Sequence, residues 1–292
     1  MNQKIHAIVV HYLNGSEFRD CLESLISEKL ISSVTVIDNS HLISDKALEL
    51  PKSNIIQVVE PSSNIGYAGG NNVGIRAAIR NKDDLVLIIN PDAELKPGAL
   101  ERLLLEMRES DLSLISPSLI ESPSTLALSK PAWDLALGRN ITNSVGISSP
   151  PSKRFKPIFF GACFLAKVDL FTNIGLLNDD LFLYGEELDL VFRMDRAGCK
   201  WKISTTAFAK HLRGSSTGQY LAKSKSTLTE FHSARSMVIN ARNYAPIRLP
   251  VWFLSRLAYA ILKSNLSISS RTAIISGLKS GLFPKIKNRF NR

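Results

Sequence analysis

Cysteine is scarce in this sequence of 292 residues, which contains only Cys21, Cys163 and Cys199. Three scattered thiols are too few for a disulfide framework or a structural zinc site, and no pair has the Cys-x-x-Cys spacing. The first ten residues also lack the apolar stretch of a secretory signal peptide, because a strand pattern begins almost at once. We therefore expect a protein of a reducing compartment, the cytoplasm.

Acidic residues are absent from residues 231–292, which carry 11 lysines and arginines. The first 230 residues hold 25 basic and 26 acidic side chains, so the formal net charge of +10 comes entirely from the C-terminal segment. A nearly neutral body with a basic tail is typical of a protein that docks on a surface. Nucleic acid is disfavoured as the partner, because a nucleic-acid-binding domain carries clustered lysines and arginines on its folded part.

The segment 246–263 has an amphipathic pattern and no uncharged run near the roughly 20 residues that span a bilayer. At helical spacing, one side holds Arg248, Ser255, Arg256, Tyr259 and Lys263, and the apolar residues Leu254, Ala258, Ile261 and Leu262 lie elsewhere. This pattern fits an interfacial helix on an anionic membrane leaflet, and a helix packed on the protein core is the alternative. The positive charge that continues to residue 292 favours the membrane.

Strand and helix patterns alternate from residue 4 to about residue 120. Buried-strand patterns are found at residues 5–10, 34–37, 55–59, 85–89 and 112–116. Helical patterns are found at residues 17–29, from the end of a small-residue loop at 64–72 to about residue 80, and at 97–109. This alternation predicts an α/β fold, Rossmann-like, with a mostly parallel sheet that helices cover on both faces.

The pattern changes after residue 120. Residues 121–156 are rich in serine and proline and have weak periodicity, which predicts a long loop. Regular structure is expected again at 157–165, with a helix at 186–197, a short strand at 201–204 and a helix at 219–243. We expect a first domain at residues 1–245 and a basic amphipathic extension at residues 246–292.

Residues 64–72 contain three glycines and three asparagines. Glycine lets backbone come close to a ligand, and this density favours ligand contact over a tight loop that only caps a helix. The segment lacks the Gly-x-Gly-x-x-Gly fingerprint and the P-loop lysine, which disfavours dinucleotide and Walker-type sites. Asp38 ends an earlier strand, where it could accept hydrogen bonds from a nucleobase or ribose, or form an Asx turn.

Asp92 and Glu94 follow the buried strand at 85–89, at the edge where open α/β sheets bind ligands. Carboxylates suit Mg²⁺ or Mn²⁺, which also bind substrate phosphates. For Asp92 a metal is favoured over an Asx turn, whereas for Glu94 a solvated side chain is slightly favoured. His211 could be a neutral metal ligand, although a lone histidine is more often structural.

Three carboxylates, Glu186, Glu187 and Asp189, crowd the first turn of the helix expected at 186–197. The helix dipole favours acidic residues there, and Asp189 can pair with Arg193 one turn later. The Tyr-Gly pair before the helix predicts a turn that could aim one carboxylate into a cleft as a general base. From the spacing alone, the structural alternative is favoured.

Taken in order, these segments resemble inverting family 2 glycosyltransferases of the GT-A fold, in the branch that contains bacterial rhamnosyltransferases of surface polysaccharide assembly. The resemblance covers residues 4–245 or so and is specific in combination, because no single motif would suffice. It is carried by residues 9–12, 36–40, 64–72, 90–92, 161–164, 183–190, 196–198, 211 and 214–216.

The resemblance implies a role for each matching position. Asp38 and Asn39 would contact the nucleotide. The nucleotide-sugar pocket would be bordered by Asn64, Gly66, Tyr67, Gly69, Gly70, Asn71, Asn72 and Asn90. The Mg²⁺ or Mn²⁺ ligands would be Asp92 and His211, with Glu94 as a weaker candidate. The catalytic carboxylates would be Glu187 as the base, Glu186 as its alternative, and Asp189 beside them.

Several positions depart from the family pattern. Asn90 stands in place of the first Asp of the Asp-x-Asp motif, and His11 and Leu13 replace residues that are usually Asn. Glu187 stands where Asp is commoner, and its extra methylene would move the carboxylate by about one C–C bond, a misplacement that can cost ~10²-fold in rate.

The reaction implied by the resemblance moves a sugar, with rhamnose favoured, from a dTDP- or UDP-linked donor to a hydroxyl of a glycan or lipid-linked acceptor. A single displacement would invert the anomeric configuration, at the inner face of the cell membrane. Two other classes compete. A sugar-phosphate nucleotidyltransferase would need a basic glycine loop near the first strand, which residues 9–15 lack. A non-enzymatic basic protein that binds membrane or nucleic acid is supported by the tail alone.

Overall fold

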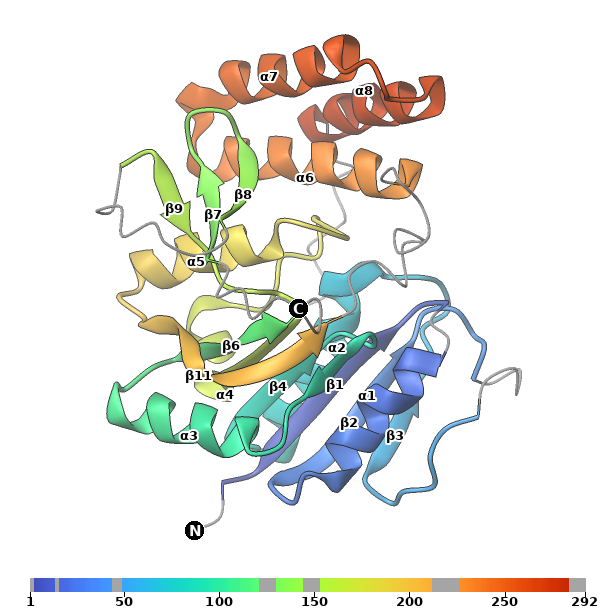
Figure 1. Ribbon diagram of the computed structural model, residues 1–292, viewed down its shortest axis with the longest axis vertical. Helices are drawn as coiled ribbons and strands as arrows, with labels where there is room; N and C mark the ends of the chain where they lie inside the picture. Colours follow the sequence, from blue (N-terminus) through green and yellow to red (C-terminus); the bar gives the residue numbers. More distant parts are fainter. Residues whose placement is uncertain are drawn as a thin grey trace.

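The computed structural model describes residues 3–13, 16–43, 49–120, 130–143, 153–211 and 226–283. Its main body is an eight-stranded sheet with the strand order β3-β2-β1-β4-β10-β6-β11-β5. Helices cover both faces of this sheet, and three C-terminal helices lie together beyond it (Figure 1). The predicted α/β fold, with a helix-flanked sheet and a helical C-terminal region, is therefore confirmed.

The large sheet is mixed. Its strands are β1 (Ile5–His11), β2 (Ile31–Asp38), β3 (Ile56–Val59), β4 (Leu85–Ile89), β5 (Ala93–Leu95), β6 (Leu114–Ile120), β10 (Cys163–Lys167) and β11 (Trp201–His211). Strands β3, β2, β1 and β4 are parallel, as are β6 and β11. Strand β10 is antiparallel to β4 and β6, and β5 is antiparallel to β11. The N-terminal end of β10 therefore meets the C-terminal end of β4.

The central strands β1 and β4 are buried along their whole length, as expected for strands covered on both faces. Successive side chains of β1 point to opposite faces. Ile8 and Val10 join the core under helix α2 (Gly66–Asn81). Ala7 and Val9 join the core under helices α1 (Ser16–Ser27) and α3 (Ala99–Glu109). The apolar runs that predict these strands thus hold two helical layers on one sheet.

The predicted loop at 64–72 is wrong for most of its length, because helix α2 begins at Gly66. A Cβ atom added at Gly70 would lie 2.8 Å from Val10 Cγ2, and one added at Gly74 would lie 2.6 Å from Ile8 Cγ2. Gly70, within the predicted loop, and Gly74, just after it, therefore serve the close packing of α2 on β1. Tertiary contact outweighs the weak helix propensity of glycine here.

The predicted loop at 121–156 is also wrong in part. Strands β7 (Lys130–Asp134), β8 (Arg139–Asn143) and β9 (Phe155–Pro157) form a second, antiparallel sheet. A buried polar group ties this sheet together: Arg154 donates two hydrogen bonds to the Asp134 carboxylate, at 2.9 and 3.0 Å. Polar contacts of this kind leave no apolar periodicity in the sequence.

The remaining helices are α4 (Val168–Ile174), α5 (Glu186–Arg196), α6 (Thr227–Tyr244), α7 (Leu249–Leu262) and α8 (Ile268–Leu282), with a 3₁₀ turn η1 at Pro246–Arg248. Helices α4 and α8 were not predicted. The strand expected at 201–204 continues to His211, past a register shift between Ile203 and Phe208. The first residues of the helix expected at 219–243 and the motif at 214–216 lie outside the described residues.

The C-terminal helices pack on the body of the protein. Trp252 of α7 is fully buried, with its ring centroid 5.7 Å from that of Trp133 in β7. Ser255 Oγ donates a hydrogen bond of 2.7 Å to Leu137 O. Among the helices described here, none is long and apolar enough to cross a membrane. The division of the chain at residues 245 and 246 stays a prediction.

Candidate active site

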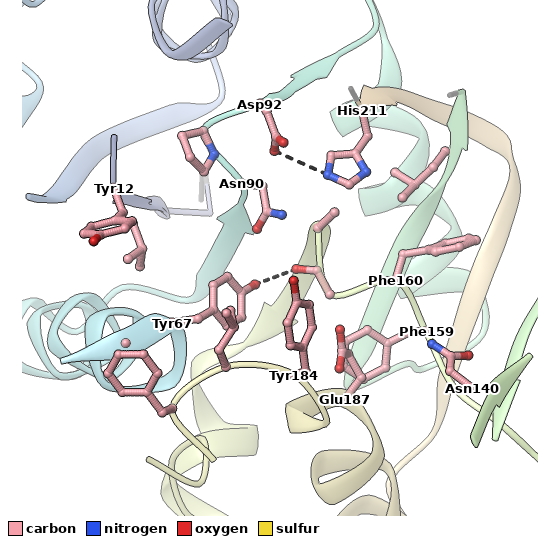
Figure 2. A pocket seen from close by; sticks show the side chains of 18 of the residues that line it. Tyr12, Tyr67, Asn90, Asp92, Asn140, Phe159, Phe160, Tyr184, Glu187 and His211 are labelled. Carbon is pink, nitrogen blue, oxygen red and sulfur yellow. Dashed lines mark hydrogen bonds and ion pairs between the residues drawn. The ribbon is translucent and has the colours of Figure 1, made fainter. Parts of the chain in front are cut away.

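A cavity of about 350 Å³ lies where the large sheet meets helix α5 and the β7–β8 hairpin. The structure brings eight of the sequence-predicted site residues together on its wall: Asn39, Asn64, Gly66, Tyr67, Asn90, Asp92, Glu187 and His211. In the view of Figure 2, Asp92 and His211 lie at one side of the cavity and Glu187 at the other. Residues from distant parts of the chain therefore share one cavity.

Pairing of β5 with β11 places His211 beside Asp92. His211 is opposite Ala93 in this antiparallel pair, and Asp92 directly precedes β5. His211 Nε2 is 3.3 Å from Asp92 Oδ1, and both side chains are almost fully buried. Asn90 follows β4, and its backbone N–H donates a hydrogen bond of 2.8 Å to Ala162 O. Asn90 Oδ1 has no hydrogen-bond partner among the described residues.

This pair of side chains fits a hard divalent cation that shares its coordination with a substrate. A carboxylate and an imidazole are suitable ligands for Mn²⁺, and carboxylate and carbonyl oxygens suit Mg²⁺. In the described part of the chain no cluster of three or more His, Cys, Asp or Glu could hold a metal alone. Glu94 lies outside the cavity wall and pairs with Lys210 at 3.2 Å and Lys96 at 3.6 Å. Phosphate oxygens would have to supply further ligands.

Glu187 lies on the first turn of α5 and faces the cavity. Gly161 packs so closely against its carboxylate that an added Cβ would collide with Glu187 Oε1. Burial raises the pKa of Glu187 above its ordinary value of 4.5, and hydrogen bonding to the backbone of Gly161 and Gly185 opposes this rise. A carboxylate with a raised pKa, open to a cavity, can act as a general base.

The neighbouring Glu186 differs from Glu187 in its surroundings. It is 3% exposed and does not line the cavity. Burial, together with the adjacent charge of Glu187, raises the pKa of Glu186 well above its ordinary value. Its Oε1 has no hydrogen-bond partner among the residues described. Two buried carboxylates so close together resist being ionised at the same time.

Asp189 lies outside the cavity wall and is engaged in structural contacts. Its carboxylate accepts hydrogen bonds from Arg193 at 2.8 Å, Tyr244 at 2.6 Å and Asn178 at 3.2 Å. The i, i+4 pair with Arg193 agrees with the structural alternative for this residue.

Asp38 is also outside the cavity wall, one residue from Asn39, which lines it. Burial would raise the pKa of Asp38, but hydrogen bonds from Ile43 N, His11 and Ser40 outweigh it and lower the pKa below its ordinary value. Asn39 Nδ2 donates to Gly66 O at 3.3 Å. Asp38 thus shapes the loop that carries Asn39, and its contact with a nucleotide stays a prediction.

The run Gly69–Asn72 lies within α2 and outside the cavity wall. Asn72 exchanges two hydrogen bonds with the backbone of Leu177, at 2.8 and 2.9 Å. Asn71 donates to Tyr67 O at 3.0 Å. These side chains hold the start of α2, whereas Tyr67 reaches the cavity and donates a hydrogen bond of 2.5 Å to Gly161 O.

Several cavity residues had not been predicted. They include Tyr12, Asn140, Phe159, Phe160 and Tyr184. Tyr12 directly follows β1, so the rule that ligands bind at the carboxyl ends of strands could have found it. Asn140 lies in β8, within the segment predicted as a loop, and no sequence signal pointed to it.

Part of this sequence matches a known protein family, and two relatives match it over most of the chain. Residues 7–171 match the family described as glycosyl transferase family 2. The low-salt glycan biosynthesis hexosyltransferase Agl10 of Haloferax volcanii is 28% identical over 202 residues, which are 67% of this chain and 63% of that protein. The N-acetylglucosaminyl-diphospho-decaprenol L-rhamnosyltransferase of Mycobacterium tuberculosis is 23% identical, with 98% of both chains covered.

Solved structures with the same fold include GalNAc-T7 with UDP, GalNAc and Mn²⁺ (TM-score 0.66, 13% identity). Residues 1–349 of S. aureus TarS with UDP-GlcNAc give a TM-score of 0.52 at 13% identity. Both matches cover 96% of this chain, which spans 56% of the GalNAc-T7 chain and 81% of the TarS chain. At this identity the likeness concerns the fold, and it agrees with the GT-A architecture.

Proposed function

The chain belongs to glycosyl transferase family 2, and on this premise we propose that it moves a sugar from a nucleoside diphosphate donor to an acceptor hydroxyl with inversion. The observation that carries the proposal is the shared cavity of Asp92, His211 and Glu187. A dTDP- or UDP-linked donor is proposed, with rhamnose as the preferred sugar. A relative named as a rhamnosyltransferase, matched over 98% of this chain, supports that preference.

The charge of the cavity wall supports a divalent cation. None of the described residues that line it is Lys or Arg, whereas a donor diphosphate is anionic. We propose that Asp92 and His211 hold Mg²⁺ or Mn²⁺. When bound, the cation would supply the positive charge that stabilises the departing diphosphate. The Mn²⁺ and UDP in the GalNAc-T7 structure are consistent with this proposal.

Nucleotide and acceptor occupy different parts of the cavity in this proposal. Tyr12 directly follows β1, Asn39 directly follows β2 and Asn64 comes just before α2, and these cavity residues would border the nucleotide. Asn140 and Phe159 lie near Glu187 and would border the acceptor. Glu187 would take the proton from the acceptor hydroxyl as the oxygen bonds to the anomeric carbon, while the bond to the diphosphate breaks.

The same wall disfavours a sugar-phosphate nucleotidyltransferase. A triphosphate would demand more positive charge than a diphosphate, and the described lining residues supply no Lys or Arg.

The membrane part of the proposal places residues 246–292 against the inner face of the cell membrane. The lipid-linked substrate in the name of the mycobacterial relative supports this placement.

A thermal-shift panel of nucleotide sugars, with and without Mn²⁺, tests the proposal. With Mn²⁺ present, the correct donor at 100 times its Kd is expected to stabilise the protein by about 2.7 kcal/mol, or several degrees in Tm. Without Mn²⁺ the shift should shrink, because nothing on the described wall neutralises the diphosphate. A shift with nucleoside triphosphates alone would favour the nucleotidyltransferase instead, and no shift with either nucleotide sugars or nucleoside triphosphates would contradict both.

The pH dependence of transfer tests the base. Only ionised Glu187 can accept a proton, so kcat/KM is expected to fall as pH drops through its pKa. Because burial raises that pKa above 4.5, the fall should occur at higher pH than for an exposed glutamate. Glu186→Gln mimics a protonated Glu186, and its kcat/KM should still fall at low pH as that of the parent protein does. A rate that stays level down to pH 4.5 would contradict the assignment.

A further inference from the structure

Helix α7 exposes an apolar stripe that the rest of the described protein does not cover. Its members are Val251, Leu254, Ile261 and Leu262 of α7 and Ile247 of the preceding turn η1, which are between 50% and 94% exposed. Val251, Leu254, Ala258 and Ile261 recur every three or four residues and so lie on one face of the helix, with Leu262 at its border. We call this face the outer stripe. Contiguous apolar surface of this kind marks an interaction site in most soluble domains.

The polar side of α7 faces the protein instead of water. Arg248 Nη1 and Trp252 Nε1 both donate hydrogen bonds of 2.8 Å to Leu135 O. Arg256 pairs with the buried carboxylate of Glu230. These contacts fix the rotation of α7 about its axis. The outer stripe is therefore presented outward by the fold and is not a consequence of a loosely attached helix.

The charge around the outer stripe selects the partner. Lys263, at the C-terminal end of α7, is exposed, and the chain contains no Asp or Glu after Glu230. Two copies of this surface would repel each other, which disfavours a second copy of the chain as the partner. Apolar side chains flanked by basic ones suit a leaflet with anionic headgroups over an apolar interior.

We infer that the outer stripe of α7 inserts into an anionic membrane surface, with Lys263 at the end of the helix on the headgroups. In Figure 1 α7 lies at the edge of the molecule farthest from the large sheet. Insertion there would leave the sheet and its cavity outside the lipid. The inference builds on the membrane contact in the proposed function and assigns it to particular side chains.

Deletion of residues 246–292 would be a poor test. Trp252, Ile274 and Leu278 are buried in the same core cluster as residues of the sheet, so their removal would unfold part of the body. Substitution on the outer stripe avoids this problem, because its side chains make few internal contacts.

The test is flotation of the full chain with phosphatidylglycerol–phosphatidylcholine vesicles and with pure phosphatidylcholine vesicles. We expect binding to the anionic vesicles, and a loss of at least tenfold in the partition coefficient for the triple variant Val251→Ser, Leu254→Ser, Ile261→Ser. Leu105→Ser is the matched control, since Leu105 is 57% exposed on α3, and it should bind like the parent protein.

Three results would overturn the inference: no binding of the parent protein to either vesicle, unchanged binding of the triple variant, or a dimer that the triple variant dissociates. The triple variant should keep the parent Tm, because the changed side chains are exposed. If it unfolds, Leu254→Ser alone must weaken binding, and Lys263→Glu must weaken binding to anionic vesicles only. No sugar nucleotide is present, so vesicle binding and sugar transfer can fail separately.

Discussion

Glu187→Gln is expected to lower the rate of sugar transfer by between about 10²-fold and about 10⁴-fold, the range for removal of a general base. Glutamine keeps the shape of the side chain and its place against Gly161, but it cannot take a proton from the acceptor hydroxyl. Donor binding should survive, because Glu187 lies across the cavity from Asp92 and His211. Single-turnover transfer and the donor-induced Tm shift measure the two properties independently.

Glu186→Gln is the matched control for this experiment. Glu186 is buried away from the cavity, and burial raises its pKa well above the ordinary value, so it is poorly placed to accept the acceptor's proton. Transfer should stay within about threefold of the parent rate, a change below 1 kcal/mol. If instead Glu186→Gln loses transfer and Glu187→Gln keeps it, the two roles must be exchanged.

Asp92→Ala is expected to lower kcat/KM by about 10²-fold to 10³-fold, since a bound cation contributes several kcal/mol to the stabilisation of developing charge. The substitution removes the carboxylate that His211 faces at 3.3 Å. The Mn²⁺-dependent part of the donor-induced Tm shift should disappear with it. Titration of Mn²⁺ against both activity and Tm gives the measurement.

Glu94→Ala is the control that distinguishes metal binding by Asp92 from a general effect of negative charge at this edge of the sheet. Glu94 pairs with two half-exposed lysines and does not line the cavity. Such surface pairs contribute about 0–1 kcal/mol, so activity and the Mn²⁺ response should be nearly unchanged. An equal loss in both variants would indicate that Asp92 acts on the local field or the fold and not as a ligand.

Much of the fold could be predicted because its central strands are short, buried and apolar. The runs at 5–10 and 85–89 could not form surface elements, and the helices between them carry apolar stripes. The positions of Asn90 and Asp92 followed from the same pattern, because residues just after such strands lie at the ligand-binding edge. His211 depended on the resemblance, since its place opposite Ala93 is set by a strand pairing.

Other features depend on tertiary contacts that leave no periodic trace. Gly70 lies in the segment predicted as a loop, but it serves the close packing of α2 on β1. The β7–β9 sheet is held by Asp134 and Arg154, in a segment without alternating apolar residues. The sequence could not distinguish Glu186 from Glu187, because the choice between adjacent carboxylates depends on which one the first turn of α5 directs to the cavity.

Gly161 and Ala162 form the turn before β10, and their contacts limit which substitutions the enzyme could accept there. Asn90 N donates to Ala162 O, Tyr67 donates to Gly161 O, and Glu187 packs on Gly161. A side chain at Gly161 would displace the carboxylate of Glu187, so this position has no freedom to accommodate new acceptors. Asn140 belongs to a separate hairpin and, among the described residues, makes no contact with this turn that fixes Glu187. Variation of acceptor choice, in a laboratory or among relatives, should therefore accumulate on the hairpin and spare the turn.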